Sequence, residues 1–176
     1  MLALLSTSTS VLAADKTEDQ LIAELASPNE TKVTDALLKL EKKYPTSTKA
    51  FPTIKKLLKD PRQKVRRKAA RVLGVLHAEV DEENIKDICA LLKGSEPREV
   101  MDGLIALRGL KAQAVVPQIV PFLKHSNSYV IRDACRTLAV LGNKDLIPSI
   151  EPLLNHSDPK VKQDAQDAIY KLRSKS

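Results

Sequence analysis

The sequence predicts an all-α protein, a right-handed solenoid of about five stacked helix pairs. The composition is rich in alanine, leucine, lysine, arginine and glutamate, with 3% aromatic residues, which favours helices over sheets. An apolar residue pair also recurs along the chain at nearly equal spacing, and a period of about 30 residues is typical of helical repeats. The recurring pairs are Leu57-Leu58, Leu91-Leu92, Phe122-Leu123 and Leu153-Leu154.

Each recurring pair closes one amphipathic helix and precedes a second one. The second helices carry apolar residues three or four positions apart, the period of one helix face. A fainter copy of the pattern begins at Leu21, which gives five pairs. The predicted pairs cover residues 17–26 and 28–44, 48–59 and 61–76, 82–93 and 96–110, 113–124 and 127–141, and 144–155 and 158–173.

Prolines mark the turns between the predicted helices. Ser27, Asp60 and Asp158 each precede a proline, and an N-cap acceptor followed by proline at the first helical position is a favourable helix start. Pro121 and Pro152 fall four residues after another proline, inside their helices, where a backbone hydrogen bond is lost. We therefore expect those two helices to kink.

Two second helices carry a family resemblance. Residues 60–74, and residues 130–142 as a second copy, resemble the second helix of a HEAT repeat of the phycobilisome-lyase type, and the resemblance spans about residues 17–173. It implies a solenoid whose second helices line the concave surface. In that family a proline, an aspartate between helices and an arginine form a structural set. Because Pro52, Asp60 and Arg66 match it, the resemblance implies a structural role for Asp60 and Arg66.

The chain is expected to form one solenoid domain over residues 15–176. Its terminal repeats carry polar outer sides, as end repeats of a solenoid need. The expected repeats are about residues 16–45, 46–79, 80–112, 113–143 and 144–176.

Residues 1–14 carry no charge and are too short to span a membrane. They end in Val11-Leu12-Ala13, a small-x-small pattern typical of signal-peptide cleavage. We therefore expect a secretory signal of a bacterial protein, hence periplasmic or secreted localisation and no transmembrane segment in the mature chain. The alternative is a disordered leader on a cytoplasmic protein.

No catalytic motif accompanies the repeats. The sequence lacks a glycine-rich phosphate loop, GxSxG, HExxH and CxxC, so we expect a non-enzyme without cofactor or metal. His125 and His156 share one repeat position and are expected to be turn residues that cap a helix. Cys89 and Cys135 are expected to be separate buried or half-buried thiols, with a disulfide as the open alternative.

The charge pattern singles out one helix face. The net charge is +7, and residues 49–71 hold ten basic residues against one acid. Helical spacing turns three of these away from the core, and equivalent positions recur two repeats later, whereas Met101 and Ile105 interrupt the stripe between them. The predicted contact residues are Lys64, Arg67, Arg71, Tyr129, Arg132 and Arg136.

These observations predict a monomeric protein-binding scaffold whose basic concave face takes an acidic partner. Two other functions remain open: a nucleic-acid binder, favoured by the isoelectric point of about 9.4, and a lyase-associated subunit, suggested by the family resemblance. A merely solvated charged face is the further alternative.

Overall fold

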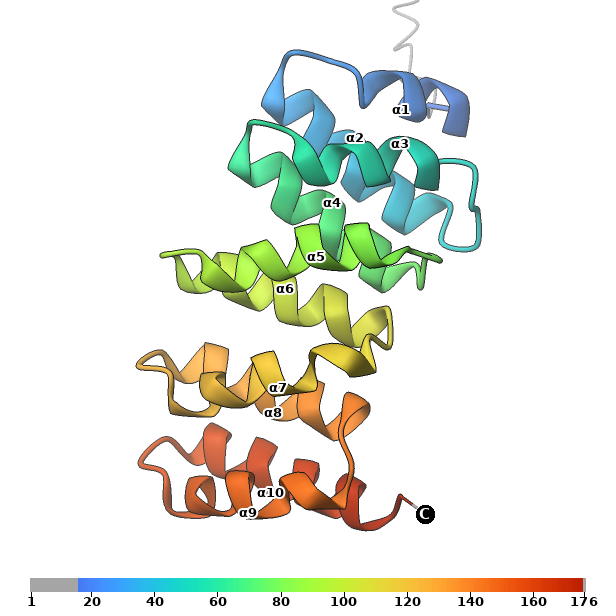
Figure 1. Cartoon of the computed structure of the whole chain (residues 1–176). Coiled ribbons are helices and arrows are strands. Elements are labelled where there is room, and N and C mark those ends of the chain that lie inside the picture. The colour runs from blue at the N-terminus through green and yellow to red at the C-terminus, as the bar shows by residue number, and fades with distance from the viewer. Residues whose placement is uncertain (1–15, 176) are drawn as a thin grey trace, which may run out of the picture.

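The computed structural model describes residues 16–175, so the predicted signal segment at residues 1–14 lies outside the described residues. Within residues 16–175 every regular element is helical, and the helices stack as five antiparallel pairs (Figure 1). The predicted all-α solenoid is confirmed. In the same range, no helix combines the length and apolarity needed to cross a membrane.

The second helix of each pair is a continuous α-helix, and the first helix is shorter. Four of the first helices continue into, or are flanked by, 3₁₀ segments. The second helices are α2 (Glu30–Lys43), α4 (Gln63–Val75), α6 (Pro97–Gly109), α8 (Ser128–Leu141) and α10 (Pro159–Arg173). The first helices are α1 (Glu18–Glu24), α3 (Phe51–Lys56) with η1 (Leu57–Lys59), α5 (Glu82–Ala90) with η2 (Leu91–Lys93), α7 (Val116–Ile119) between η3 (Gln113–Val115) and η4 (Val120–Lys124), and α9 (Ile147–Ile150) between η5 (Lys144–Leu146) and η6 (Glu151–Asn155).

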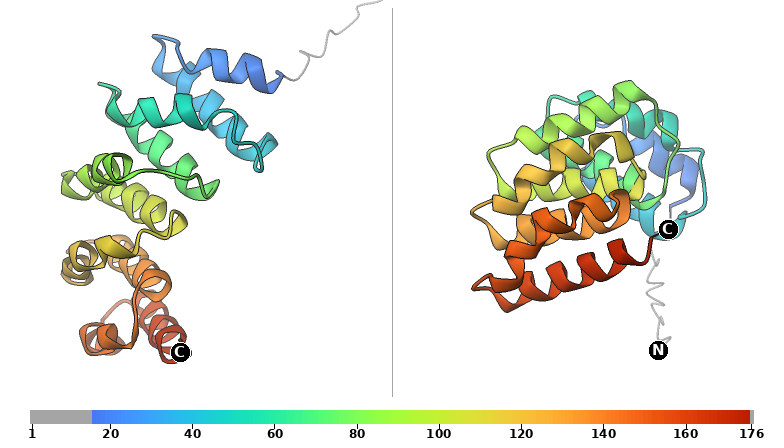
Figure 2. Two further views of the ribbon diagram at one scale, coloured as in Figure 1. Left: turned by 45° about the vertical axis from the view of Figure 1, so that its right-hand side comes forward. Right: turned by 60° about the horizontal axis from the view of Figure 1, so that its bottom comes forward.

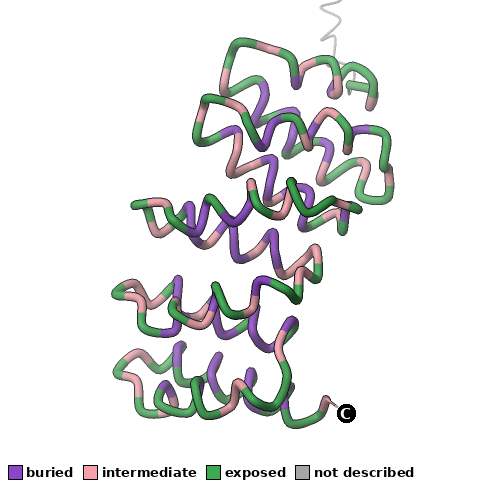
Figure 3. The backbone as a smooth tube through the Cα atoms, in the orientation of Figure 1, coloured by how far each residue is buried: buried purple, intermediate pink, exposed green. Residues whose placement is uncertain are grey.

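The hydrophobic core runs the length of the stack. Buried segments alternate with exposed ones along every helix, and the buried sides face each other between helices (Figure 3). Leu73, Leu107 and Leu138 occupy equivalent positions on successive second helices and are fully buried. Since no single pair encloses its own apolar face, each repeat is stabilised by its neighbours.

Two glycines allow α4 and α6 to approach closely. A Cβ atom added to Gly74 would lie 2.5 Å from the Ala106 Cα, and one added to Gly109 would lie 2.0 Å from the Gly74 carbonyl oxygen. A larger residue at either position forces the helices apart. Glycine is therefore required here by backbone packing.

The proline predictions hold in part. The α-helical hydrogen bonding ends just before Pro121 and Pro152, which lie in η4 and η6, as expected for helices that break there. Asp158 caps α10 as predicted, with its carboxylate accepting from the Lys160 amide. Asp60 does not cap α4, because the chain makes one further turn and the helix begins at Gln63. Ser27 likewise does not cap α2, which begins at Glu30 and is capped by Asn29.

Candidate partner-binding surface

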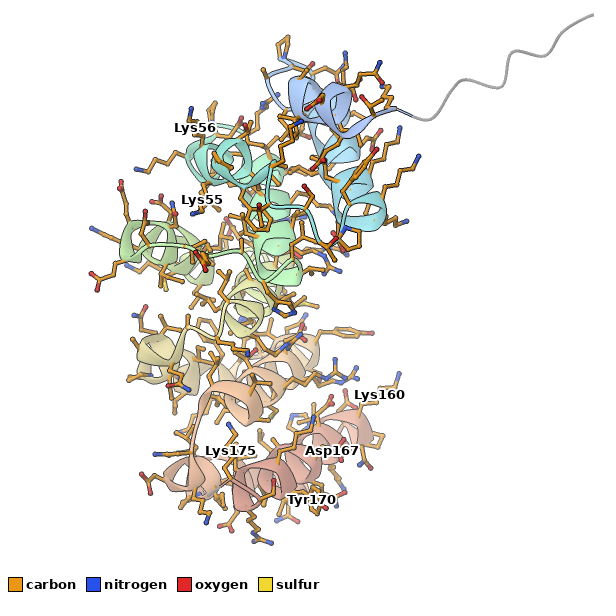
Figure 4. All side chains as sticks on the ribbon, turned by 90° about the vertical axis from the view of Figure 1, so that its right-hand side faces the viewer. Lys55, Lys56, Lys160, Asp167, Tyr170 and Lys175 are labelled. Carbon is orange, nitrogen blue, oxygen red and sulfur yellow. The ribbon has the colours of Figure 1, made fainter. Side chains whose placement is uncertain are left out.

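The stack bends, and the second helices lie on the inner side of the bend (left view of Figure 2). The six predicted contact residues lie on two of these helices, three on α4 and three on α8. Figure 4 shows the molecule turned further about the same axis, with all side chains drawn. In this view Lys160 of the second helix α10 lies on the opposite side of the molecule from Lys55 and Lys56 of the first helix α3. The predicted set therefore belongs to the concave side.

The first pair of predicted arginines is bound to a buried aspartate of the next repeat. Arg67 Nε lies 2.9 Å from Oδ2 of Asp102 on α6, and Arg71 Nη1 lies 4.0 Å from Oδ1 of the same residue. The Asp102 side chain is 6% exposed. The two arginines are four residues apart, so both reach across one helix interface to one carboxylate.

The second pair occupies the same positions two repeats later and adds hydrogen bonds, which the Arg67 Nε contact with Asp102 does not form. Arg132 Nε donates to Oδ2 of Asp164 on α10 at 2.6 Å, and Arg136 Nε donates to Oδ1 at 2.9 Å. Arg136 Nη2 adds a bond to Oδ2 at 3.1 Å. We call each arginine pair with its aspartate an arginine–aspartate cluster; both join the second helices of adjacent repeats.

Within each cluster the two arginines differ in exposure. The side chains of Arg67 and Arg132 are 17% and 18% exposed, whereas those of Arg71 and Arg136 are 35% and 46% exposed. One arginine of each pair is thus largely enclosed beside its aspartate. The other retains open surface and faces the concave side.

The interface between α6 and α8 lacks such a cluster. Met101 and Ile105 stand at the arginine positions, as the sequence indicated, and both are half-buried. The buried aspartate is present as Asp133, but its Oδ1 lies 3.8 Å from Arg108 Nη1 and 3.7 Å from Arg136 Nη1. Burial raises the pKa of the Asp133 carboxyl, because arginines at these distances offset only part of its desolvation.

The positive charge of the surface exceeds the negative charge beneath it. Five arginines share three aspartates, which leaves a surplus of two positive charges before any lysine is counted. The surface is therefore basic but much less so than the sequence suggests. The arginines are Arg67, Arg71, Arg108, Arg132 and Arg136, and the aspartates are Asp102, Asp133 and Asp164.

The two remaining predicted contacts lie at the N-terminal ends of α4 and α8. Lys64 Nζ lies 3.8 Å from Glu30 Oε1 of α2, and both side chains are exposed. Tyr129 is 60% exposed, and Arg132 Cζ lies 6.0 Å from its ring centroid. A cavity of about 440 Å³ beside Tyr129 is lined by Arg132, Lys160 and Asp158, so this end of the surface offers an aromatic face with two cations and one carboxylate.

Asp60 and Arg66, to which the resemblance assigns a structural role, both form hydrogen bonds in the turn before α4, together with Arg62. Arg66 Nη1 donates to the backbone carbonyls of Asp60 and Pro61, at 2.8 and 2.9 Å. The Asp60 carboxylate is instead held by Arg62, whose Nε and Nη2 donate to it at 2.8 and 2.7 Å. These hydrogen bonds hold the pKa of Asp60 below its usual value.

Arg62 was not foreseen from the sequence. Its Nη1 also donates to the carbonyls of Ser27 and Pro28, at 3.1 and 2.9 Å, and so joins the turns of the first two repeats. The only sequence signal was its position directly after Asp60-Pro61. Nothing in the helical periodicity marks a turn residue of this kind.

The remaining polar candidates serve the fold. His125 and His156 each accept a backbone amide through Nδ1 at 3.0 Å, from Asn127 and Asp158. Within residues 16–175, no group of three His, Cys, Asp or Glu side chains is placed to hold a metal ion.

The two cysteines are separate and buried. Burial raises the pKa of Cys135 to about 12, so its thiol stays protonated and weakly nucleophilic at neutral pH. Burial also raises the pKa of Cys89.

The repeat geometry agrees with a family match over the C-terminal half. Residues 85–170 match the family model described as HEAT repeats. This chain contains HEAT repeats over those residues. An 82-residue stretch is also 35% identical to the human "Stalled ribosome sensor GCN1", covering 44% of this chain and 3% of that protein.

Solved structures show the same fold along nearly the whole chain. The complex of CpcE and CpcF of phycocyanin lyase from Nostoc sp. PCC7120 superposes with a TM-score of 0.77 at 20% identity, covering 98% of this chain and 71% of that one. A designed armadillo repeat protein in complex with the peptide (KR)4 gives a TM-score of 0.63 at 17% identity, covering 87% of this chain and 80% of that one. At these identities the likeness shows the fold alone.

Proposed function

We propose that this protein is a non-enzymatic scaffold whose concave surface binds an acidic segment of a protein partner. The observation that carries the proposal is the difference in exposure within each arginine–aspartate cluster. All four arginines contact the buried aspartates, but Arg67 and Arg132 are largely enclosed, whereas the side chains of Arg71 and Arg136 are 35% and 46% exposed. A rigid, partly desolvated arginine is a favourable contact for a carboxylate.

The spacing of the two arginines specifies the partner further. Arg71 and Arg136 are equivalent positions two repeats apart, and Ile105 occupies the same position in the repeat between them. Packed helices lie about 8 to 10 Å apart, so the two guanidinium groups are separated by about 20 Å. An extended segment rises about 3.3 Å per residue, so its two acidic residues stand about six positions apart with an apolar residue midway.

The alternatives receive less support from this surface. A nucleic-acid binder is favoured by the net charge of +7, but buried aspartates lie under the arginines where a phosphate backbone would run. A lyase-associated role is suggested by the resemblance to phycocyanin lyase, which extends to the fold alone. Export remains part of the proposal and depends on residues 1–14.

A synthetic peptide tests the concave site. The probe is an acetylated nonapeptide with glutamate at its second and eighth positions, leucine at its fifth and serine elsewhere, labelled for fluorescence anisotropy. We expect Arg71→Gln with Arg136→Gln to weaken binding at least about tenfold, since each lost charged contact contributes about 1.5 kcal/mol or more. Binding should also weaken as salt rises.

The matched control is Lys55→Gln with Lys56→Gln, which removes the same charge from α3 on the other side of the molecule. This control should bind as the unaltered protein does. Equal losses in both variants would mean that overall charge alone attracts the peptide. Unchanged binding in the arginine variant would reject the concave site.

A further inference from the structure

A second hollow lies at the edge of the stack, away from the arginine–aspartate clusters. It has a volume of about 1000 Å³ and lies between the connection from α4 to α5 and the connection from α6 to η3. Both connections emerge at the same edge of the solenoid, the right-hand side of Figure 1. We call it the edge groove; it is lined by residues 77–82, 85 and 109–115.

The two walls of the edge groove are built alike. Two residues after the last helical residue of α4 and of α6 the backbone is left-handed, at His77 with φ 51° and at Lys111 with φ 53°. The next amide in each wall returns to the helix, from Ala78 to the Leu73 carbonyl at 2.9 Å and from Ala112 to the Leu107 carbonyl at 3.1 Å. These closures are those of a Schellman motif, which fixes the direction in which the chain leaves the helix.

A further contact ties the two walls together. His77 Nδ1 lies 2.8 Å from the Gly109 carbonyl oxygen, at hydrogen-bond distance. The groove is therefore held open by backbone geometry on both sides and joined at its base. A site formed in this way loses little conformational entropy when a ligand binds.

The floor of the edge groove is apolar. Val80, Ile85 and Leu110 are half-buried, pack against the hydrophobic core and keep part of their surface open. Beneath them, Ala78 and Val115 are buried. The groove thus offers the apolar side chains of a ligand a lining that is continuous with the hydrophobic core.

The rim of the edge groove carries uncompensated negative charge. Glu79 and Glu82 line it, are exposed and form no ion pair within residues 16–175, whereas the neighbouring Glu83 pairs with Lys59. Asp81 adds a third carboxylate and caps α5 by accepting the Asn84 amide at 2.8 Å. Among the described residues of the lining, Lys111 is the one lysine or arginine.

We propose that the edge groove binds an extended peptide segment that carries apolar side chains together with lysine or arginine. The apolar floor takes the former and the unpaired carboxylates of Glu79 and Glu82 attract the latter. This ligand has the opposite charge to the acidic segment proposed for the concave surface. The stack of helix pairs would then hold two partners of opposite charge on two faces.

Amide chemical shifts of the isotope-labelled protein test this inference. The probe is an acetylated octapeptide of alternating leucine and lysine, titrated into the full chain. We expect shifts confined to the amides of residues 77–82 and 109–115. A serine–lysine and a leucine–glutamate octapeptide of equal length should each bind at least about tenfold more weakly.

Two variants separate the contributions of charge and apolar surface. Glu79→Gln with Glu82→Gln, and Val80→Ser alone, should each weaken the leucine–lysine peptide at least fivefold. The matched control is Asp35→Asn with Glu151→Gln, exposed acids outside the groove, which should leave binding unchanged. Shifts that map to α4 and α8, or equal binding of the serine–lysine peptide, would overturn the proposal. Arg71→Gln with Arg136→Gln should not affect this peptide, so the two sites are judged separately.

Discussion

The interfaces among the second helices α4, α6, α8 and α10 are of two kinds. α4 meets α6, and α8 meets α10, through a complete arginine–aspartate cluster with distances as short as 2.9 and 2.6 Å. α6 meets α8 with the aspartate in place but with Met101 and Ile105 where the arginines would stand. Asp133 consequently has its nearest cations at 3.7 and 3.8 Å.

This difference shows how one repeat position serves two purposes. An arginine in the cluster stabilises a buried carboxylate and also presents charge to the concave side. An apolar residue at the same position leaves the carboxylate poorly compensated but places an uncharged patch between two basic ones. At the interface of α6 and α8 the buried carboxylate is thus less well compensated, but the concave surface gains an apolar patch between two basic ones. The proposed partner recognises this alternation of basic and apolar surface.

The apolar layers are the same at both kinds of interface, and truncation should show it. Leu73, Leu107 and Leu138 are each 0% exposed at equivalent positions. Replacing any of them by alanine leaves a cavity and should lower the free energy of unfolding by about 2 to 5 kcal/mol, measured by urea denaturation. A loss below about 1 kcal/mol at one of the three would mean that the interfaces differ in packing as well as in charge.

The buried aspartates should separate the two kinds of interface. Asp102→Asn or Asp164→Asn removes a charge that two arginines share, and we expect a loss of about 1 to 3 kcal/mol in unfolding free energy. Asp133→Asn removes a charge that the fold compensates poorly, so the loss should be below about 1 kcal/mol. Equal losses in all three variants would show that the distant arginines compensate Asp133 as well as the close ones do their partners.

The periodicity of the sequence was enough to predict the helices. The apolar spacing of three and four, within a repeat of about 30 residues, yields the five pairs and the buried second-helix stripes, because one helix face must be covered by the next repeat. The N-terminus of α4 was missed by two residues. The Asp60-Pro61 pattern forms a turn closed by Arg62 there, and a turn of that kind leaves no periodic signal.

The exposure of the predicted arginines depends on the next helix in the stack, which the spacing of residues within one helix does not reveal. Spacing correctly placed Arg67 and Arg132 off the apolar stripe, yet their side chains are 17% and 18% exposed because the next helix covers them. A signal was present: Asp102, Asp133 and Asp164 recur at equal spacing on second helices, next to apolar positions. An acidic residue that recurs with the repeat period beside buried apolar positions indicates a basic partner on the neighbouring helix.

The smallest expected effect is on the pH dependence of folding. Because the pKa of Asp133 is raised in the folded protein, its folded state binds the proton more tightly than the unfolded chain does. The stability contributed by this group is complete below the ordinary value of 3.8 and falls as the pH rises through the raised pKa. Asp60, whose pKa is lowered by Arg62, acts in the opposite sense: its contribution is present above the ordinary value and is lost as the pH falls through the lowered pKa.

Carboxyl carbon chemical shifts, followed by NMR from pH 2 to 7, measure both groups directly. Asp133 should titrate above 3.8 and Asp60 below it. Installing the missing arginines by Met101→Arg with Ile105→Arg completes the cluster at the interface of α6 and α8, so the pKa of Asp133 should move down, because close guanidinium groups favour the charged carboxylate. The pKa of Asp60, four helices away along the chain, should stay where it is and serves as the internal control. If Asp133 keeps its raised pKa beside two new arginines, then the contrast between the interfaces stems from the depth of burial and not from the identity of residues 101 and 105.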